Sequence, residues 1–139
     1  MSTTTDKAEA PMHSRRDRAR VVALALLSVA ILVHSYTAFF KADGGVGGFV
    51  IGLWAWSLVP YGVGAALLFV FRNSPAAVGW LILPAFMDLM TYRSVFVSPQ
   101  GSTAALGLLF APLWNLVLLG PVGGVIGWLA GRRLRRRSA

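Results

Sequence analysis

The feature that most constrains the fold of this chain is a set of four long apolar segments separated by short polar breaks. The segments run over residues 21–40, 49–71, 76–97 and 104–131. Only the third contains formal charges, at Asp88 and Arg93. A helix of about 20 residues rises about 30 Å, the thickness of the hydrocarbon core of a bilayer. Each segment is therefore long enough to cross a membrane.

The character of the segments decides between the two architectures that a bilayer allows. A chain in lipid must satisfy its backbone hydrogen bonds internally, which leaves helices or closed barrels. Barrel strands alternate polar and apolar residues, whereas these segments are continuously apolar. The breaks between them are rich in Gly, Pro, Ser and Asn, which favour turns. The sequence predicts an all-α integral membrane bundle over residues 21–131, with four transmembrane helices and short loops.

The positive charges of the chain gather at its two ends. The sequence holds 13 Lys and Arg against 5 Asp and Glu, a formal net charge of +8. The basic residues of the C-terminal segment are Arg132, Arg133, Arg135, Arg136 and Arg137. Lys and Arg accumulate in cytoplasmic segments, and an even number of helices places both ends on one side. We therefore predict that both termini are cytoplasmic. The richness in Ala, Gly, Val and Arg is compatible with a bacterial protein, so we expect the membrane to be a bacterial inner (plasma) membrane.

The two tails have different expected roles. Residues 1–20 are polar and lack apolar periodicity, which predicts a disordered basic cytoplasmic tail. Residues 132–139 form a second basic cytoplasmic tail, whose arginines we expect to anchor the chain at the headgroups of anionic inner-leaflet lipids. A secretory or twin-arginine signal around Arg15 and Arg16 is the alternative for the N-terminal region. Residues 21–40, however, are longer than a typical signal core and lack a clear cleavage site.

Each predicted helix carries a polar side chain at a similar depth. From the helical rise, Asp88 lies about 18 Å and His34 about 20 Å from the inner face. Asn115 lies about 16 Å and Ser57 about 12 Å from the outer face. We predict a buried polar layer that consists of His34, Ser57, Asp88 and Asn115, with Tyr61 and Tyr92 at its edges. Arg93 points away from Asp88 and is expected to reach the outer headgroups.

Two interpretations of this layer are open. A charged group at membrane depth is costly and often functional, so Asp88 beside an imidazole that exchanges protons near neutral pH indicates a proton or cation site. Alternatively, the polar side chains hydrogen-bond across helices and fix their register. Pro60, Pro84, Pro112 and Pro121 predict helix kinks, and Pro84 lies one turn before Asp88.

The last apolar segment carries small residues at helical spacing. Glycines four residues apart on one face let another helix approach closely. The packing residues that we predict are Gly120, Gly123, Gly124 and Gly127. We expect the partner to lie within the chain, with Gly62, Gly64 and Ala66 of the second helix as the candidate.

The sequence contains no motif that supports catalysis. It lacks Cys, the phosphate-binding G-x-x-x-x-G-K-[ST], H-E-x-x-H and G-x-S-x-G. Its two histidines, His13 and His34, lie on the tail and on the first helix, so they do not form a metal site. We expect a non-enzymatic protein without cofactor, metal or nucleic-acid partner.

Three functions are compatible with these features. The leading hypothesis is a small inner-membrane accessory, assembly or regulatory subunit that acts by association, as a homo-oligomer or with a larger membrane protein. The alternative is a small oligomeric transporter or channel with a proton- or cation-coupled site at Asp88 and His34. A lytic pore-forming protein is the third.

Overall fold

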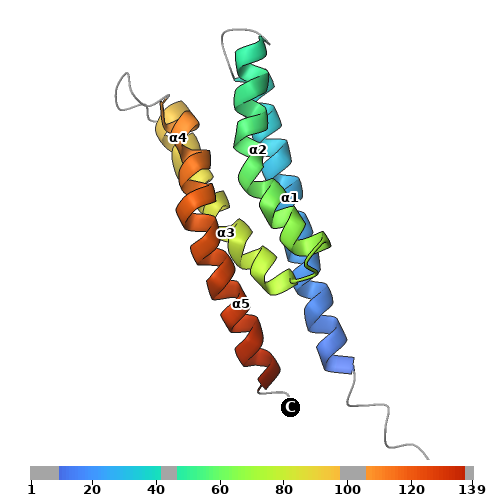
Figure 1. The fold of residues 1–139 in the computed structure, drawn as a ribbon. Helices are drawn as coiled ribbons and strands as arrows, with labels where there is room; N and C mark the ends of the chain where they lie inside the picture. Colours follow the sequence, from blue (N-terminus) through green and yellow to red (C-terminus); the bar gives the residue numbers. More distant parts are fainter. Residues whose placement is uncertain (1–9, 42–46, 98–105, 137–139) are drawn as a thin grey trace, which may run out of the picture.

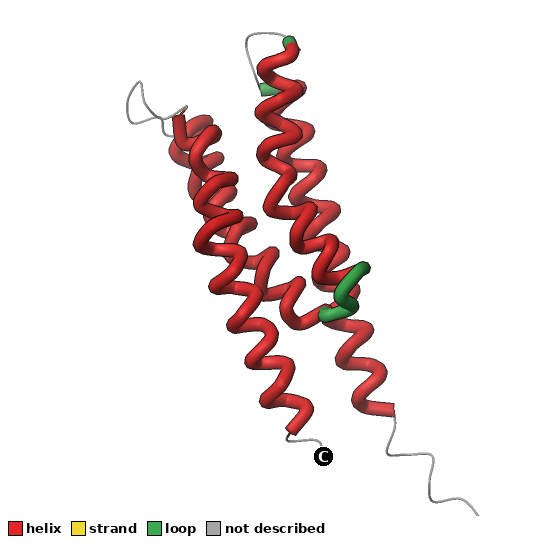
Figure 2. The backbone as a smooth tube through the Cα atoms, in the orientation of Figure 1, coloured by secondary structure: helices red, strands yellow, loops and turns green. Residues whose placement is uncertain are grey.

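The chain forms four helical rods that run alternately up and down. The computed structural model describes residues 10–41, 47–97 and 106–136, and shows no strand within them. The elements are α1 (Ala10–Phe40), α2 (Gly48–Phe69), α3 (Ser74–Tyr92), the π-helical turn η1 (Arg93–Val97), α4 (Leu106–Trp114), the π-helical turn η2 (Asn115–Leu119) and α5 (Gly120–Arg136). The turn η1 continues α3, and α4, η2 and α5 make one continuous rod (Figures 1 and 2).

Each rod has the length and the surface of a membrane span. Four helical stretches are long and apolar enough to cross a bilayer, namely Asp17–Phe40, Gly48–Phe69, Ser74–Val97 and Leu106–Arg136. Large apolar side chains cover the outside, and Leu32 and Phe40 are 69% and 78% exposed. Such a surface suits lipid and not water. The predicted all-helical fold is confirmed, and four of its helical stretches are long and apolar enough to span a membrane.

The helices extend further at both ends than the sequence analysis expected. Residues 10–20, expected to belong to a disordered tail, form the first turns of α1, and α5 continues through Arg136. Ala, Met and Arg are good helix formers, and extension of an existing helix needs no new nucleus. Pro11 lies in the first turn, where its missing N–H is tolerated. Residues 1–9 and 137–139, including Arg137, lie outside the described residues.

The α2–α3 connection is a tight turn with local signals for both helices. Arg72 has a positive φ of 51°, a conformation that reverses the chain after α2. Asn73 caps α3, since its side-chain oxygen accepts the N–H of Ala76 at 3.4 Å. Pro75 follows in the first turn, where its missing N–H removes no helical bond. The start of α3 is thus fixed at Ser74.

The glycines of α5 pack against α3. A Cβ added at Gly79 of α3 or at Gly123 or Gly127 of α5 would collide with backbone atoms of the other helix. The two helices therefore meet backbone to backbone, as small residues permit in membranes. The expected partner on α2 is incorrect: a Cβ added at Gly62 would meet no atom of another element within 4 Å, and one added at Gly64 would meet Leu81 and Trp80 of α3.

Trp80 links this contact to α2. Its ring packs against Gly120 and Gly124 of α5, and its indole N–H donates to the backbone oxygen of Pro60 at 2.8 Å. On the other side of α3, Leu81 joins a core that also contains Ala23, Leu27, Ala30, Tyr61, Leu68 and Ala77. The helix α3 is thus packed against each of the other rods.

The arginines of α5 lie in its last turns and are exposed. Arg132, Arg133, Arg135 and Arg136 are all exposed, and the Arg132 guanidinium lies 5.4 Å from the centre of the Trp128 ring. This cation–π contact holds one arginine beside an indole, a side chain enriched at membrane interfaces. The Ala10 end of α1 and the Arg136 end of α5 lie at the same end of the bundle (Figure 1).

The backbone contact between α3 and α5 predicts that Gly79→Ala destabilises the bundle. The new methyl group forces the helices apart, and overpacking of this kind costs about 1–3 kcal/mol. We expect a lower thermal unfolding midpoint in detergent for Gly79→Ala, measured by circular dichroism. Gly62→Ala is the matched control, because that position is open. An unchanged midpoint for Gly79→Ala would contradict the close contact.

Candidate functional site

Asp88 is the centre of a hydrogen-bonded cluster inside the bundle. The Tyr61 hydroxyl donates to Asp88 Oδ2 at 2.6 Å, and Asn115 Nδ2 donates to Asp88 Oδ1 at 2.7 Å. His34 Nε2 lies 3.3 Å from Asp88 Oδ2. We call these four residues, one from each rod, the Asp88 cluster. A single carboxylate therefore contacts the other three rods.

The second nitrogen of His34 determines where protons lie in this cluster. His34 Nδ1 is 2.9 Å from the backbone oxygen of Ala30, and a carbonyl oxygen only accepts hydrogen bonds. Nδ1 therefore carries a hydrogen. In a neutral imidazole Nε2 is then an acceptor that faces the carboxylate, also an acceptor. A favourable contact between Nε2 and Oδ2 needs one further proton, held by His34 or by Asp88.

Local helix geometry brings Asn115 to this position. Asn115 begins the wide turn η2, which lies between Pro112 and Pro121. Proline removes a helical backbone bond, and in this turn the N–H of Gly120 bonds to the oxygen of Asn115, five residues earlier. Asn115 is 1% exposed, and its Oδ1 has no hydrogen-bond partner in the described part of the chain.

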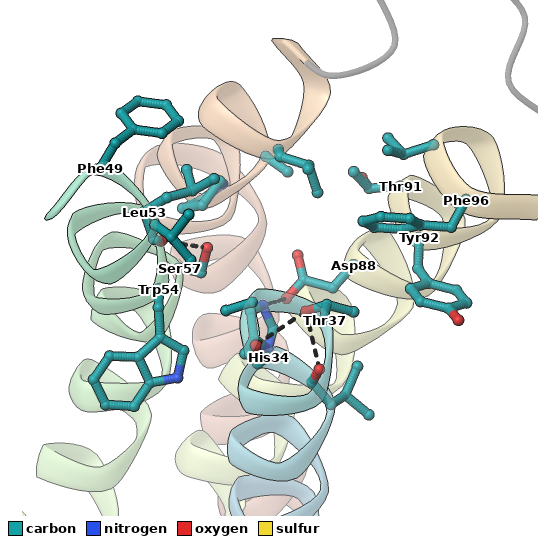
Figure 3. A pocket seen from close by; sticks show the side chains of 17 residues that line it. His34, Thr37, Phe49, Leu53, Trp54, Ser57, Asp88, Thr91, Tyr92 and Phe96 are labelled. Atoms are coloured by element: carbon teal, nitrogen blue, oxygen red, sulfur yellow. Dashed lines mark hydrogen bonds and ion pairs between the residues drawn. The ribbon is translucent and has the colours of Figure 1, made fainter. Parts of the chain in front are cut away.

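A cavity of about 290 Å³ lies directly beside the cluster. Figure 3 shows the side chains of Asp88 and His34 between Trp54 of α2 and the aromatic rings of Tyr92 and Phe96. The side chains of His34 and Asp88 are 14% and 15% exposed. Both ionisable groups of the pair line this space, so a small molecule in the cavity contacts them.

The cavity occupies the half of the bundle distant from Ala10 and Arg136. Its lining includes Phe49 at the start of α2, Phe96 at the end of the third rod and Leu108 near the start of α4. On the opposite side of the cluster, Leu81 and Pro84 are fully buried. The polar cluster therefore separates a cavity from a tightly packed apolar layer.

Part of the predicted polar layer forms the cluster, and part does not. His34, Asp88 and Asn115 meet as their matched depths predicted. Ser57 lines the cavity, but its hydroxyl donates to the backbone oxygen of Leu53 at 2.9 Å. Tyr61 was expected at the edge of the polar layer, but it is the residue of α2 that bonds to Asp88.

The remaining polar residues of α3 lie outside the cluster. Tyr92 lines the cavity wall, and its ring centre is 5.2 Å from that of Phe96. Arg93 is exposed, as expected from its position on the helix. Thr37 and Trp54 also line the cavity, although they were not among the predicted site residues. Their helical spacing carried no signal for this, because apolar and hydroxyl residues are common on every face of such helices.

A comparison with known protein families, curated proteins and solved structures found no match for this chain. Within the described residues, no group of three or more His, Asp or Glu side chains is placed to bind a metal ion. The chemistry of the site therefore rests on the Asp88 cluster and on the cavity beside it.

The cluster predicts an energetic coupling between Tyr61 and Asp88. Removal of one partner leaves the other without its hydrogen bond, so the effects of Tyr61→Phe and Asp88→Leu are not additive. We expect a coupling of about 0.6–1.7 kcal/mol in a double-mutant cycle of detergent unfolding, the range of such bonds in membranes. Tyr92→Phe with Asp88→Leu is the control pair and is expected to be additive. Additivity of both pairs would contradict the observed hydrogen bond.

Proposed function

We propose that the chain is a small, non-enzymatic, multi-pass membrane protein that exchanges a proton or a small cation at Asp88 and His34, as a subunit of an oligomeric transporter or channel. The observation that carries this proposal is the 3.3 Å contact between two ionisable side chains, His34 and Asp88, that both line a cavity. A pair of this kind can release its proton to the cavity and take it back. Asn115 and Tyr61 hold the carboxylate in place during this exchange.

The cost of the site also supports a functional role. A carboxylate at membrane depth is expensive even on lenient scales, by about 2.5–3.5 kcal/mol. Helix register alone can be fixed by uncharged groups such as the amide of Asn115. The tight apolar packing around Leu81 closes the opposite side of the cluster, as expected for a carrier that exposes its site to one side at a time.

We also propose a location and an orientation. The charge distribution favours both termini in the cytoplasm, and the arginines of α5 then face the anionic inner leaflet. The richness in Ala, Gly, Val and Arg is compatible with a bacterial inner membrane. In this orientation the cavity lies in the outer half of the membrane. The cluster would receive ligands or protons from outside the cell.

The second candidate is the accessory subunit that acts by association. The observation that favours it is the exposure of α1, since only 11% of the apolar window in its candidate membrane span is buried. This apolar face is available to lipid or to another membrane protein, including a second copy of the chain. The Asp88 cluster would then serve to fix the register of the rods.

The proposed orientation predicts opposite labelling of two serine positions. The sequence contains no Cys, so a single introduced thiol reports its own location. In intact cells we expect Ser102→Cys, between the third and fourth spans, to react with a membrane-impermeant maleimide. Ser138→Cys, after α5, should react only once the membrane is permeabilised. The reverse pattern would overturn the orientation.

The proposed exchange predicts that Asp88→Asn abolishes proton flux. Asn keeps the shape of the side chain but cannot accept or release the proton. We would measure flux in proteoliposomes with a trapped pH-sensitive dye, under an imposed membrane potential or pH gradient. The mutant should fall to the level of empty liposomes.

The matched control for this experiment is Thr37→Val. Thr37 lines the same cavity, but its hydroxyl donates to the backbone oxygens of Val33 and His34, both at 3.0 Å, and not to Asp88. It should retain the wild-type flux. Equal flux in the wild type and in Asp88→Asn would exclude Asp88 from conduction, and absence of flux from both would favour the accessory function.

A further inference from the structure

The cavity beside the Asp88 cluster has the properties of a ligand site. We infer that it binds a compact organic cation with an apolar or aromatic body, and that the bound cation replaces the proton shared by His34 and Asp88. This inference rests on the proposed function, because it names the substrate class of the same site. Size, wall chemistry and charge balance support it separately.

The volume restricts the ligand to a small molecule. Pockets for small ligands measure about 300–1,000 Å³, so a cavity of about 290 Å³ is at the lower limit. A single aromatic ring with a short substituent is of suitable size. A lipid headgroup with its glycerol and chains is too large to enter whole.

The walls of the cavity favour a cation over an anion. They contain Phe49, Trp54, Tyr92 and Phe96, whose ring faces attract positive charge. Among the described residues that line the cavity, none is Lys or Arg.

Four of the side-chain donors in these walls are engaged within the protein. The Trp54 indole donates to the Ser35 hydroxyl oxygen at 3.2 Å, and the Thr37 and Ser57 hydroxyls donate to the backbone of their own helices. His34 Nδ1 is bonded to the oxygen of Ala30. The hydroxyls of Thr91 and Tyr92 are the other donors in the described walls, so an anion would find neutral hydroxyls there but no Lys or Arg.

Charge balance connects the cation to the proton. With the shared proton in place, His34 and Asp88 together are electrically neutral. Loss of the proton leaves one negative charge in apolar surroundings, which is costly without compensation. A cation next to Asp88 compensates that charge, while the neutral imidazole keeps its bond to Ala30. The proton leaves through the cavity, and one positive charge replaces another.

Benzyltrimethylammonium is a suitable probe for this exchange. Its charge is permanent, so every proton released on binding comes from the protein. Isothermal titration calorimetry of the purified full chain in detergent, in buffers of different ionisation enthalpy, gives the number of protons released. We expect saturable binding with release of about one proton per cation. This measurement on the wild type needs no variant.

Matched compounds and variants separate the possible outcomes. Neopentylbenzene, the neutral carbon analogue of the probe, and benzenesulfonate should bind at least about tenfold more weakly. Asp88→Asn should weaken cation binding at least about tenfold, whereas Gly62→Ala, at an open position outside the cavity lining, should change it less than about twofold. Equal affinity for the neutral analogue, binding without proton release, or absence of binding would each overturn the inference.

The inference and the proposed function fail in different ways. Proton flux in proteoliposomes without any cation binding would leave the proposed function standing and overturn the cation site. Cation binding with proton release but without flux would support the site and remove transport from the function.

Discussion

The need to satisfy one carboxylate within an apolar bundle governs the arrangement of the helices. Asp88 accepts hydrogen bonds from Tyr61 and Asn115 and contacts His34, so each neighbouring rod must present a particular residue at one depth. A slide of any rod by one helical turn, about 5.4 Å, would break its bond to Asp88. In lipid, where apolar contacts between helices compete with equally apolar chains, such polar bonds carry much of the specificity.

The third rod carries both this polar anchor and the closest backbone contact. Gly79 allows α3 to meet α5, and Trp80 then spans from α5 to the backbone of Pro60. Gly79 and Asp88 lie about two and a half turns apart on one helix, so together they fix both its depth and its rotation. The cavity lies on the far side of Asp88 from Gly79. There the rods carry larger side chains, and neither a glycine contact nor a bond to Asp88 holds them together.

The number of rods and the depth of the polar residues could be predicted from the sequence, because hydropathy and helical rise depend only on residue order. The meeting of His34, Asp88 and Asn115 followed from depth alone. The choice of Tyr61 over Ser57 did not follow, because the two share one face of α2, one turn apart.

The glycines of α5 could be recognised by their four-residue spacing. Their partner helix could not, because α3 contributes a single glycine, Gly79, and one glycine makes no repeat. The N-terminal extension of α1 was missed because its residues have no apolar face. Their helix is continuous with the span that follows.

The wide turn η2 affects how the fourth rod can tolerate a change in chain length. A π-helical turn holds one residue more than an ordinary turn while the flanking helices keep their facing. A shorter chain that lacks one residue within 116–119 can close this segment to regular α-helix. Asn115 would still face Asp88, and the glycines of α5 would still face α3. The segment thus acts as a spacer that tolerates loss of one residue, in a rod where a deletion elsewhere would rotate everything beyond it by about 100°.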